Sequence, residues 1–266
     1  MDFGSLTVFQ IKNLLNEIEI TDSNIGEITN SLLMDSRVSV KKFAKQIENR
    51  YEIIKNNQIM NEKFYDFDRE FVLSNDYVIA GCDEVGRGPL AGPIVCASVV
   101  LDLCDESRII YDINDSKKIK SREFRKIISD RIMEKAKHFK IIEISNCDID
   151  RIGIGEANQK GFRDSILGLG VKLDLVLSDG YPVKDLNIKN VHVIKGDTKS
   201  ASIMCASIIA KVYRDELMFK YHEEFPEYDF LNNVGYGTNN HVDAIKKFGI
   251  CKYHRKTFLK NYMTII

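Results

Sequence analysis

Acidic side chains follow short apolar runs at three places in the sequence. They are Asp83 and Glu84 after the run that begins at Tyr77, Asp179 at the end of LVLSD, and Asp197 at the end of VIKGD. In sheets whose strands are joined through helices, ligand sites gather beyond the carboxyl ends of the strands. Four carboxylates gathered there repel one another unless cations lie between them. Because carboxylate oxygens favour Mg²⁺ or Mn²⁺ over zinc, the acids predict a site for such ions.

Two of these acids can be explained without a shared site, but the adjacent pair cannot. A lone Asp at a strand end is more often a turn former or a helix cap, which covers Asp179 and Asp197 individually. Successive strand residues point to opposite faces, so we expect the strand to end or bulge between Asp83 and Glu84. The glycines of the following Gly-Arg-Gly, residues 86–88, are where we expect that departure, because glycine adopts backbone conformations that other residues avoid.

The glycine stretch also allows a rival interpretation. GRGPLA, residues 86–91, fits the G-x-G-x-x-A pattern of dinucleotide-binding loops. That pattern must open a helix, whereas Pro89 and Pro93 follow here and PIVCASVVL is typical of a strand. The sequence therefore disfavours a nucleotide cofactor, and it contains no GxxxxGK[ST] phosphate-binding loop.

The elements that must position the acids can be predicted from apolar periodicity. Runs rich in β-branched residues predict strands at 77–83, 93–101, 138–145, 173–180 and 190–197. Helical spacing predicts helices at 118–138, after residue 150 as far as about 170, at 199–225, and at 240–249 with its end at Gly249. The first of these helices has Ser121 as its expected N-cap and an expected apolar stripe of Phe124, Ile127, Ile128, Ile132 and Ala136. Two initial strands followed by strands that alternate with helices predict an α/β fold, with a mixed sheet covered by helices.

Residues 1–71 have a different texture from the rest of the chain. Segments 9–20 and 39–60 show helical spacing, with Val40, Phe43, Ala44, Ile47 and Tyr51 on one stripe. We therefore expect a small helical extension over 1–71 and the main domain over 72–266.

Composition is that of an ordinary globular protein. The 266 residues are 44% hydrophobic and 29% charged, with no apolar stretch of membrane-spanning length and no secretory signal pattern. Six scattered cysteines without a CxxC pair fit a reduced, cytoplasmic protein, and Cys82, Cys96, Cys104 and Cys205 have apolar surroundings. Cys251 and His254 could offer two ligands to zinc, but two ligands without a second pair favour coincidence.

Charge along the chain is uneven although the net charge is only −1. No acid follows Asp243, while cations accumulate at Lys246, Lys247, Lys252, Arg255, Lys256 and Lys260. On charge alone, this cluster is equally well explained as a contact for phosphates or as a solvated helix face.

Several segments together resemble a known family, the type 2 ribonucleases H, and within it bacterial ribonuclease HII. They are AGCDEVGRGPLAGP, NDSKK, LVLSDG, VIKGDTKSASIMCASIIAKVYRD, GYGTNNHVDAI and YHRKTF, which occur in the family's order over roughly residues 77–258. The resemblance implies a ribonuclease H-like fold with a central mixed β-sheet flanked by helices and a helical C-terminal part. The helical extension is similar to one found in some bacterial members. The chain departs from the family pattern in GICKYHRKTF, which lacks a frequent proline, and at Ser178, where valine is common.

The resemblance implies a metal-dependent endonuclease. Its substrates would be the RNA strand of RNA–DNA hybrids and DNA duplexes containing ribonucleotides, cut 5′ to the ribonucleotide to leave 3′-hydroxyl and 5′-phosphate ends. Two Mg²⁺ or Mn²⁺ ions would take part. The implied catalytic residues and metal ligands are Asp83, Glu84, Asp179 and Asp197.

Substrate contacts are implied in the same way. The backbone of Gly86, Arg87 and Gly88 would contact 2′-hydroxyl groups, and Tyr236 would pack on the sugar after the ribonucleotide. Contacts to the nucleic-acid backbone would come from Asn114, Ser116, Lys117, Lys199 and Arg255.

The remaining expectations concern alternatives and assembly. A non-catalytic module that binds RNA–DNA hybrids is the alternative, although all four acids are present. Asp215 is expected on a helix surface as a partner of Arg214 or Lys211. We expect the extension to add affinity for the duplex rather than chemistry, and the family default is a monomer.

Overall fold

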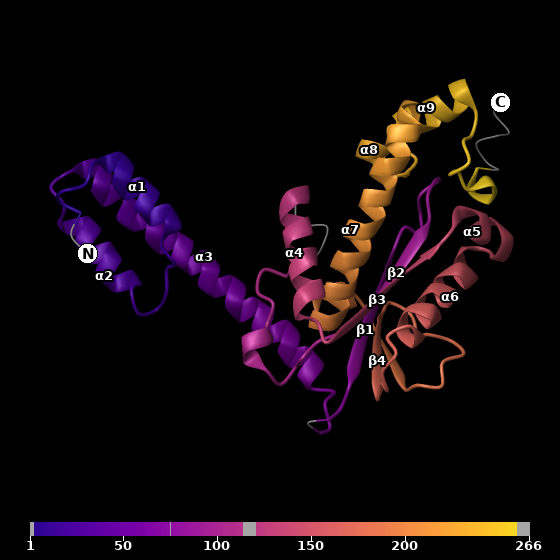
Figure 1. Cartoon of the computed structure of the whole chain (residues 1–266), viewed down its shortest axis with the longest axis horizontal. Coiled ribbons are helices and arrows are strands. Elements are labelled where there is room, and N and C mark those ends of the chain that lie inside the picture. The colour runs from indigo at the N-terminus through magenta and orange to yellow at the C-terminus, as the bar shows by residue number, and fades with distance from the viewer. Residues whose placement is uncertain (1–2, 75, 114–120, 260–266) are drawn as a thin grey trace. The chain divides into compact units, whose positions relative to one another are not determined.

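The computed structural model describes residues 3–74, 76–113 and 121–259 (Figure 1). The chain divides into two compact units, Met1–Met60 and Asn61–Ile266. The division lies inside one long helix, α3 (Val38–Arg69), about ten residues before the change expected from the sequence. The last turns of α3 belong to the second unit because Tyr65 is buried in its core and Asp68 accepts a hydrogen bond from the Ser202 N–H at 2.8 Å.

The first unit is a small helical assembly. It contains α1 (Val8–Glu17), α2 (Ile25–Met34) and the beginning of α3. The expected stripe on α3 is confirmed, because Val40, Ala44 and Ile47 are buried against residues of α1 and α2. The short helix α2 was not among the elements expected from the sequence.

The second unit is built on a five-stranded mixed sheet, and its strands are those expected from the sequence. They are β1 (Ile79–Val85), β2 (Ile94–Val100), β3 (His138–Ile144), β4 (Leu175–Asp179) and β5 (Asn190–Val193), in the order β3-β2-β1-β4-β5. The pairs β1–β2 and β2–β3 are antiparallel, whereas β1–β4 and β4–β5 are parallel. This arrangement confirms the α/β, ribonuclease H-like fold implied by the resemblance.

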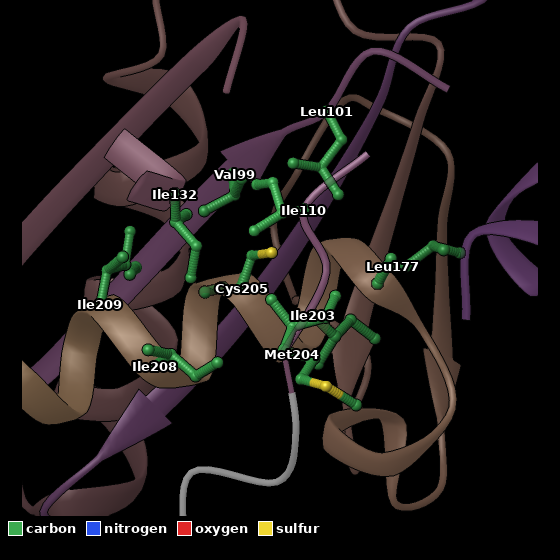
Figure 2. Close-up of a cluster of buried hydrophobic side chains, with 14 of the residues drawn as sticks. Val99, Leu101, Ile110, Ile132, Leu177, Ile203, Met204, Cys205, Ile208 and Ile209 are labelled. Carbon is green, nitrogen blue, oxygen red and sulfur yellow. The ribbon is translucent and has the colours of Figure 1, made fainter. Parts of the chain in front are cut away.

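Helices cover both faces of this sheet (Figure 1). The helices α4 (Arg122–Lys135) and α7 (Ala201–Glu224) cover one face, and α5 (Asn146–Ile152) and α6 (Ile154–Leu167) cover the other. Strand side chains alternate between the two faces, so Ile79 packs with α7 while the next residue, Ala80, packs with α6. Figure 2 shows the buried cluster on the face that α4 and α7 cover, where Val99 of β2 lies near Ile132 of α4 and Ile110.

Local sequence patterns predicted where α4 begins better than they predicted which of its residues are buried. Ser121 caps α4 as expected, because its hydroxyl accepts a hydrogen bond from the Phe124 N–H at 3.2 Å. The expected stripe of α4 is only half correct, since Ile128 and Ile132 are buried but Phe124 and Ile127 are exposed. The single helix expected after residue 150 is two helices, α5 and α6, separated at Gly153 where φ is 80°.

The C-terminal part is made of short elements. It contains α8 (Phe230–Asn233) and α9 (Asn239–Phe248), and α9 ends at Gly249 as expected. Single 3₁₀ turns occur at Glu106–Arg108, Gly196–Thr198, Pro226–Tyr228 and Lys256–Phe258. Cys104 is exposed rather than set in apolar surroundings. Within the described residues, no helix combines the length and the apolar character needed to cross a membrane.

Candidate active site

The four predicted acids line a single cavity of about 500 Å³ in the second unit. They are Asp83 and Glu84 from β1, Asp179 from the end of β4, and Asp197 from the 3₁₀ turn before α7. Asp83 and Asp179 follow Ile79 and Leu175 at even spacing, which places them on the face of the sheet that α7 covers. The fold thus brings together residues that are more than a hundred positions apart in the sequence.

Glu84 reaches this cavity in a way that the sequence did not predict. The expected strand break between Asp83 and Glu84 is wrong, because β1 keeps a one-to-one register with β2 through Val85. The parallel ladder to β4 ends earlier, at Cys82 and Ser178. Beyond that point β1 has no partner in β4, so the long side chain of Glu84 enters the same cavity from the opposite face of the strand.

Neighbouring groups hold the acids in place. The Gly196 N–H donates to Asp179 Oδ1 at 2.6 Å, which joins the end of β4 to the turn that carries Asp197. A Cβ atom on Gly196 would lie 2.6 Å from Ile203 Cδ1 and 3.3 Å from Asp179 Oδ1, so a larger residue there would make the end of the Ile203 side chain move. Asp83 accepts a hydrogen bond from the Glu84 N–H at 2.7 Å and another from the Ser207 hydroxyl of α7.

Burial and mutual repulsion favour the protonated forms of two acids. Burial, with the charge of Glu84, raises the pKa of Asp83 well above its usual range. Burial raises the pKa of Glu84 to about 7; the nearby Arg87 opposes this shift and the charge of Asp179 adds to it. Glu84 Oε2 is buried and has no hydrogen-bond partner within the described structure. A cation in the cavity would relieve both the repulsion and the unpaired oxygen.

The donor set fits a hard divalent ion, although the side chains are not yet arranged as a cage. In the parts of the chain that the structure describes, no three His, Cys, Asp or Glu side chains already have the geometry that holds a metal ion. Oxygens of Asp83 and Asp179 accept backbone hydrogen bonds, and Glu84 Oε1 lies 3.5 Å from Arg87 Nη1. Glu84 Oε2, which has no hydrogen-bond partner within the described structure, is therefore the oxygen of this carboxylate that remains available to an ion.

The glycine segment and Tyr236 lie on the wall of the same cavity. Gly86, Arg87, Gly88 and Tyr236 all line it. A Cβ atom on Gly88 would lie 3.8 Å from Tyr236 Cε1, so these residues are direct neighbours. No helix follows Gly88, because the chain continues irregularly into β2, and the dinucleotide-loop interpretation is therefore wrong.

Other predicted contacts lie elsewhere. Lys199 is exposed just after the turn that carries Asp197 and does not line the cavity. Arg255 is completely buried, so its side chain can neither contact a phosphate of the substrate nor lie on a solvated surface. Both expectations for this residue are wrong. Asn114, Ser116 and Lys117 lie outside the described residues.

Asp215 does not line the cavity that the four acids share. It pairs with Lys211 at 2.6 Å, as expected, and with Arg125 at 3.5 Å. Contrary to expectation, it is buried rather than exposed on the helix, and Arg214 binds backbone carbonyls instead of Asp215.

Cys251 and His254 belong to a hydrogen-bonded chain whose two histidines, His241 and His254, are buried. His254 Nδ1 lies 2.9 Å from the Cys251 N–H and 3.1 Å from its sulfur, and His254 Nε2 lies 3.0 Å from His241 Nε2. His241 Nδ1 in turn lies 2.8 Å from the Tyr236 carbonyl oxygen. One arrangement of protons satisfies every contact: His241 donates to Tyr236, His254 donates to His241, and Cys251 donates to His254.

Sequence reasoning missed three residues of the site. Ser207 and Lys211 of α7 line the cavity, and Tyr181 lies beneath the guanidinium of Arg87, 5.2 Å from ring centroid to carbon. Ser207 and Lys211 are four residues apart and therefore share one face of α7. Two polar residues on one face of an otherwise apolar helix segment were the signal that could have revealed them.

Comparisons of the sequence with known proteins identify the family. The sequence model of the ribonuclease HII family matches residues 80–262. Ribonuclease HII of Clostridium perfringens is 47% identical over 257 residues, covering 95% of this chain and 93% of that protein. Ribonuclease HII of Clostridium tetani is 43% identical over 268 residues, covering 99% of this chain and 97% of that protein.

Solved structures support the fold. Ribonuclease H2 from Pyrococcus horikoshii superposes with a TM-score of 0.60 at 22% identity, covering 71% of this chain and 98% of that one. Bst-RNase HIII in complex with Mn²⁺ gives a TM-score of 0.56 at 18% identity, covering 72% of this chain and 70% of that one. Family match, identity and fold agree: this chain is a ribonuclease H hydrolase and belongs to the ribonuclease HII family.

Proposed function

We propose that this chain cuts the RNA strand of RNA–DNA hybrids and also cuts DNA duplexes 5′ to embedded ribonucleotides, leaving 3′-hydroxyl and 5′-phosphate ends. One observation carries the proposal. Four carboxylates from three segments line the same cavity as the Gly86–Gly88 backbone and Tyr236. The cavity thus combines groups suited to phosphodiester hydrolysis with groups suited to reading a sugar.

The proposed cofactors are two Mg²⁺ or Mn²⁺ ions, held by Asp83, Glu84, Asp179 and Asp197. When bound between such acids, paired ions stabilise the attacking and leaving oxygens of an in-line displacement. Oxygen donors and the unpaired Glu84 Oε2 fit this choice of ion. The Mn²⁺ complex of Bst-RNase HIII, which shares the fold, also supports it.

The proposed roles of the remaining groups concern recognition. The 2′-hydroxyl group distinguishes RNA from DNA, and the exposed backbone at Gly88 is accessible to it. Tyr236, which is 45% exposed beside Gly88, offers a ring face to the neighbouring sugar. Lys211, which is paired with Asp215, also lines the cavity wall and can offer its ammonium group to a phosphate.

The test is cleavage of a labelled DNA duplex carrying one ribonucleotide, with Mg²⁺, Mn²⁺ or EDTA. We expect one metal-dependent cut 5′ to the ribonucleotide. Asp179→Asn should lower the rate by more than about a hundredfold, because even partners of metal ligands cost ten- to a hundredfold when removed. Asp185→Asn makes the same chemical change at a carboxylate whose side chain is 87% exposed, and it should leave the rate unchanged.

Two results would contradict the proposal. One is the absence of any cut with either ion, on this duplex and on a long RNA–DNA hybrid. The other is a wild-type rate in Asp179→Asn, which would mean that the acid cluster does not carry the reaction.

A further inference from the structure

Two completely buried arginines lie beneath the glycine segment of the active site. Arg255, near the C-terminus, donates from Nη2 to the Gly86 carbonyl at 2.6 Å and from Nη1 to the Arg87 carbonyl at 3.0 Å. Its Nε donates to Gly92 at 2.8 Å and its Nη2 also contacts Pro93 at 3.1 Å. One guanidinium thus fixes both ends of the segment between β1 and β2.

Arg214 of α7 also holds this segment. Its Nε donates to the Pro93 carbonyl at 2.9 Å and its Nη2 to the Ala91 carbonyl at 3.1 Å. A Cβ atom on Gly86 would lie 2.3 Å from Arg214 Nε, so the guanidinium lies directly against the backbone of Gly86. The glycine at position 86 is therefore required by this packing, quite apart from any substrate.

Arg214 also connects this segment to the turn that carries Tyr236. Its Nη1 donates to the Val234 carbonyl at 2.9 Å. The two backbones meet directly as well, because the Leu90 N–H donates to the Gly235 carbonyl at 2.8 Å. A Cβ atom on Gly235 would lie 2.4 Å from the Ala91 carbonyl oxygen, so the two backbones approach too closely for any side chain at position 235.

Packing alone does not explain charged residues in these positions. All of the hydrogen bonds named above end on backbone carbonyl oxygens, and within the described residues no carboxylate pairs with either guanidinium. Burial, together with the charge of Arg214, lowers the pKa of Arg255 to about 9, so both cations are costly to bury. What the guanidinium group supplies is a rigid planar fork whose donors fix several carbonyls at set distances.

We propose that Arg214 and Arg255 are positioning residues that fix the distance between the Gly86–Gly88 backbone and Tyr236, and thereby set selectivity for a ribonucleotide followed by a deoxyribonucleotide. This inference rests on the proposed function. The two recognition elements read adjacent sugars, so a small change in their separation weakens simultaneous contact. A strand made only of RNA lacks the deoxyribose, and its cleavage depends less on that separation.

The test compares kcat/KM on a DNA duplex with one ribonucleotide against kcat/KM on an RNA–DNA hybrid. The ratio of the two values is the readout, because a smaller folded fraction lowers both values equally and cancels. Arg255→Lys and Arg214→Lys keep the charge but lose the fork, and each should lower the ratio by about tenfold. Arg69→Lys is the matched control, since Arg69 donates to the Leu103 carbonyl at 2.8 Å away from the cavity, and it should leave the ratio unchanged.

The outcomes separate the inference from the function on which it rests. An active wild type with unchanged ratios in both lysine variants overturns the inference alone. A wild type that cuts neither substrate overturns the proposed function and this inference with it. If neither lysine variant folds, Phe258→Leu removes only the ring that lies 5.1 Å from the Arg255 guanidinium carbon. It should lower the ratio by about threefold, and an unchanged ratio there also overturns the inference.

Discussion

Glu84 is a buried carboxyl group whose charge depends on pH near neutrality. Burial raises its pKa to about 7, and a bound cation would require the ionised form. We therefore expect the affinity for Mn²⁺, measured by isothermal titration calorimetry, to rise between pH 6 and pH 8. Protons should be released on binding, which the dependence of the heat on the buffer reveals. An affinity that stays constant over this range would show that the acids are already ionised without metal.

Gly86 and Gly88 have different reasons to be glycine. Gly86 has a φ of 101° and no room for a Cβ atom, so Gly86→Ala should cost about 3 kcal/mol of unfolding free energy. Gly88 does not have a positive φ, and its Cβ atom would make only ordinary contact with Tyr236. Gly88→Ala should leave stability within about 0.5 kcal/mol, yet it should lower kcat/KM by more than about tenfold by blocking the backbone.

Thermal unfolding and cleavage kinetics on the two alanine variants test this contrast. If Gly88→Ala retained full activity, the backbone at this position would not approach the substrate. If Gly86→Ala were as stable as the wild type, the position of Arg214 beneath it would be wrong.

Among elements, α7 depends on a residue from the end of α3. The Asp68 carboxylate accepts the Ser202 N–H in the first turn of α7, four residues after the turn that carries Asp197. Burial raises the pKa of Asp68 from 3.8 to about 6. A pKa raised on folding means that the carboxyl contributes stability below pH 4 and loses it as the pH rises through 6.

Replacing this carboxyl should remove that pH dependence. The amide oxygen of an asparagine side chain would accept the same N–H without a charge, so Asp68→Asn should gain stability relative to the wild type as the pH rises. Between pH 4 and pH 7, the unfolding free energy of the variant should rise by about 2 to 3 kcal/mol relative to that of the wild type. A difference between the two proteins that is the same at both pH values does not affect this comparison. Denaturant unfolding of both proteins at pH 4 and pH 7 measures this change. If the difference in unfolding free energy between the two proteins were the same at both pH values, Asp68 would not be buried as described.

The strands and the acids were predictable, because both depend on local patterns. The run IVCASVV of β2 is buried on every residue, and a strand buried on both faces needs such a run. Asp83, Asp179 and Asp197 were found because each follows a recognisable apolar run. The path of Glu84 was not predictable, because it depends on where the β1–β4 ladder ends, and no local pattern marks that point.

Buried charge was the other limit of sequence reasoning. Arg255 stands among lysines, and charge patterning therefore assigned it to the surface. Its burial depends on carbonyls at Gly86 and Gly92, more than 160 residues earlier in the chain. Helical spacing likewise placed Asp215 on a helix surface. In the structure it is buried, and it pairs with Arg125 of α4, a tertiary contact that no local pattern marks.

At the scale of the whole molecule, the boundary between the two units, after residue 60, indicates where the chain can be shortened. A chain of residues 61–266 keeps Tyr65, whose hydroxyl accepts the Ile110 N–H at 3.0 Å, and the Asp68 cap of α7. We expect it to fold and to keep its kcat at saturating substrate. A chain that begins at residue 72 loses both contacts and should be less stable by several kcal/mol, at about 2 to 5 kcal/mol for the buried ring alone.

The first unit should instead contribute affinity for the duplex. Lys41, Lys42 and Lys45 are exposed near the start of α3 and can contact phosphates. Removing residues 1–60 should raise KM by about fivefold, with a weaker dependence of KM on salt. Steady-state kinetics at two salt concentrations check this, and a loss of kcat in the 61–266 chain would assign chemistry to the first unit.

The histidine pair behind Tyr236 has a consequence for spectroscopy. The proton that His254 Nε2 donates to His241 Nε2 lies between two buried rings and is therefore sheltered from solvent. Burial lowers the pKa of His254 to about 4, so the pair stays neutral across the range in which the enzyme would be handled. Such a proton exchanges slowly with water, and in a proton NMR spectrum its signal lies apart from those of the backbone amides. Its signal would report, without any added probe, whether the turn that carries Tyr236 is closed against the C-terminal segment.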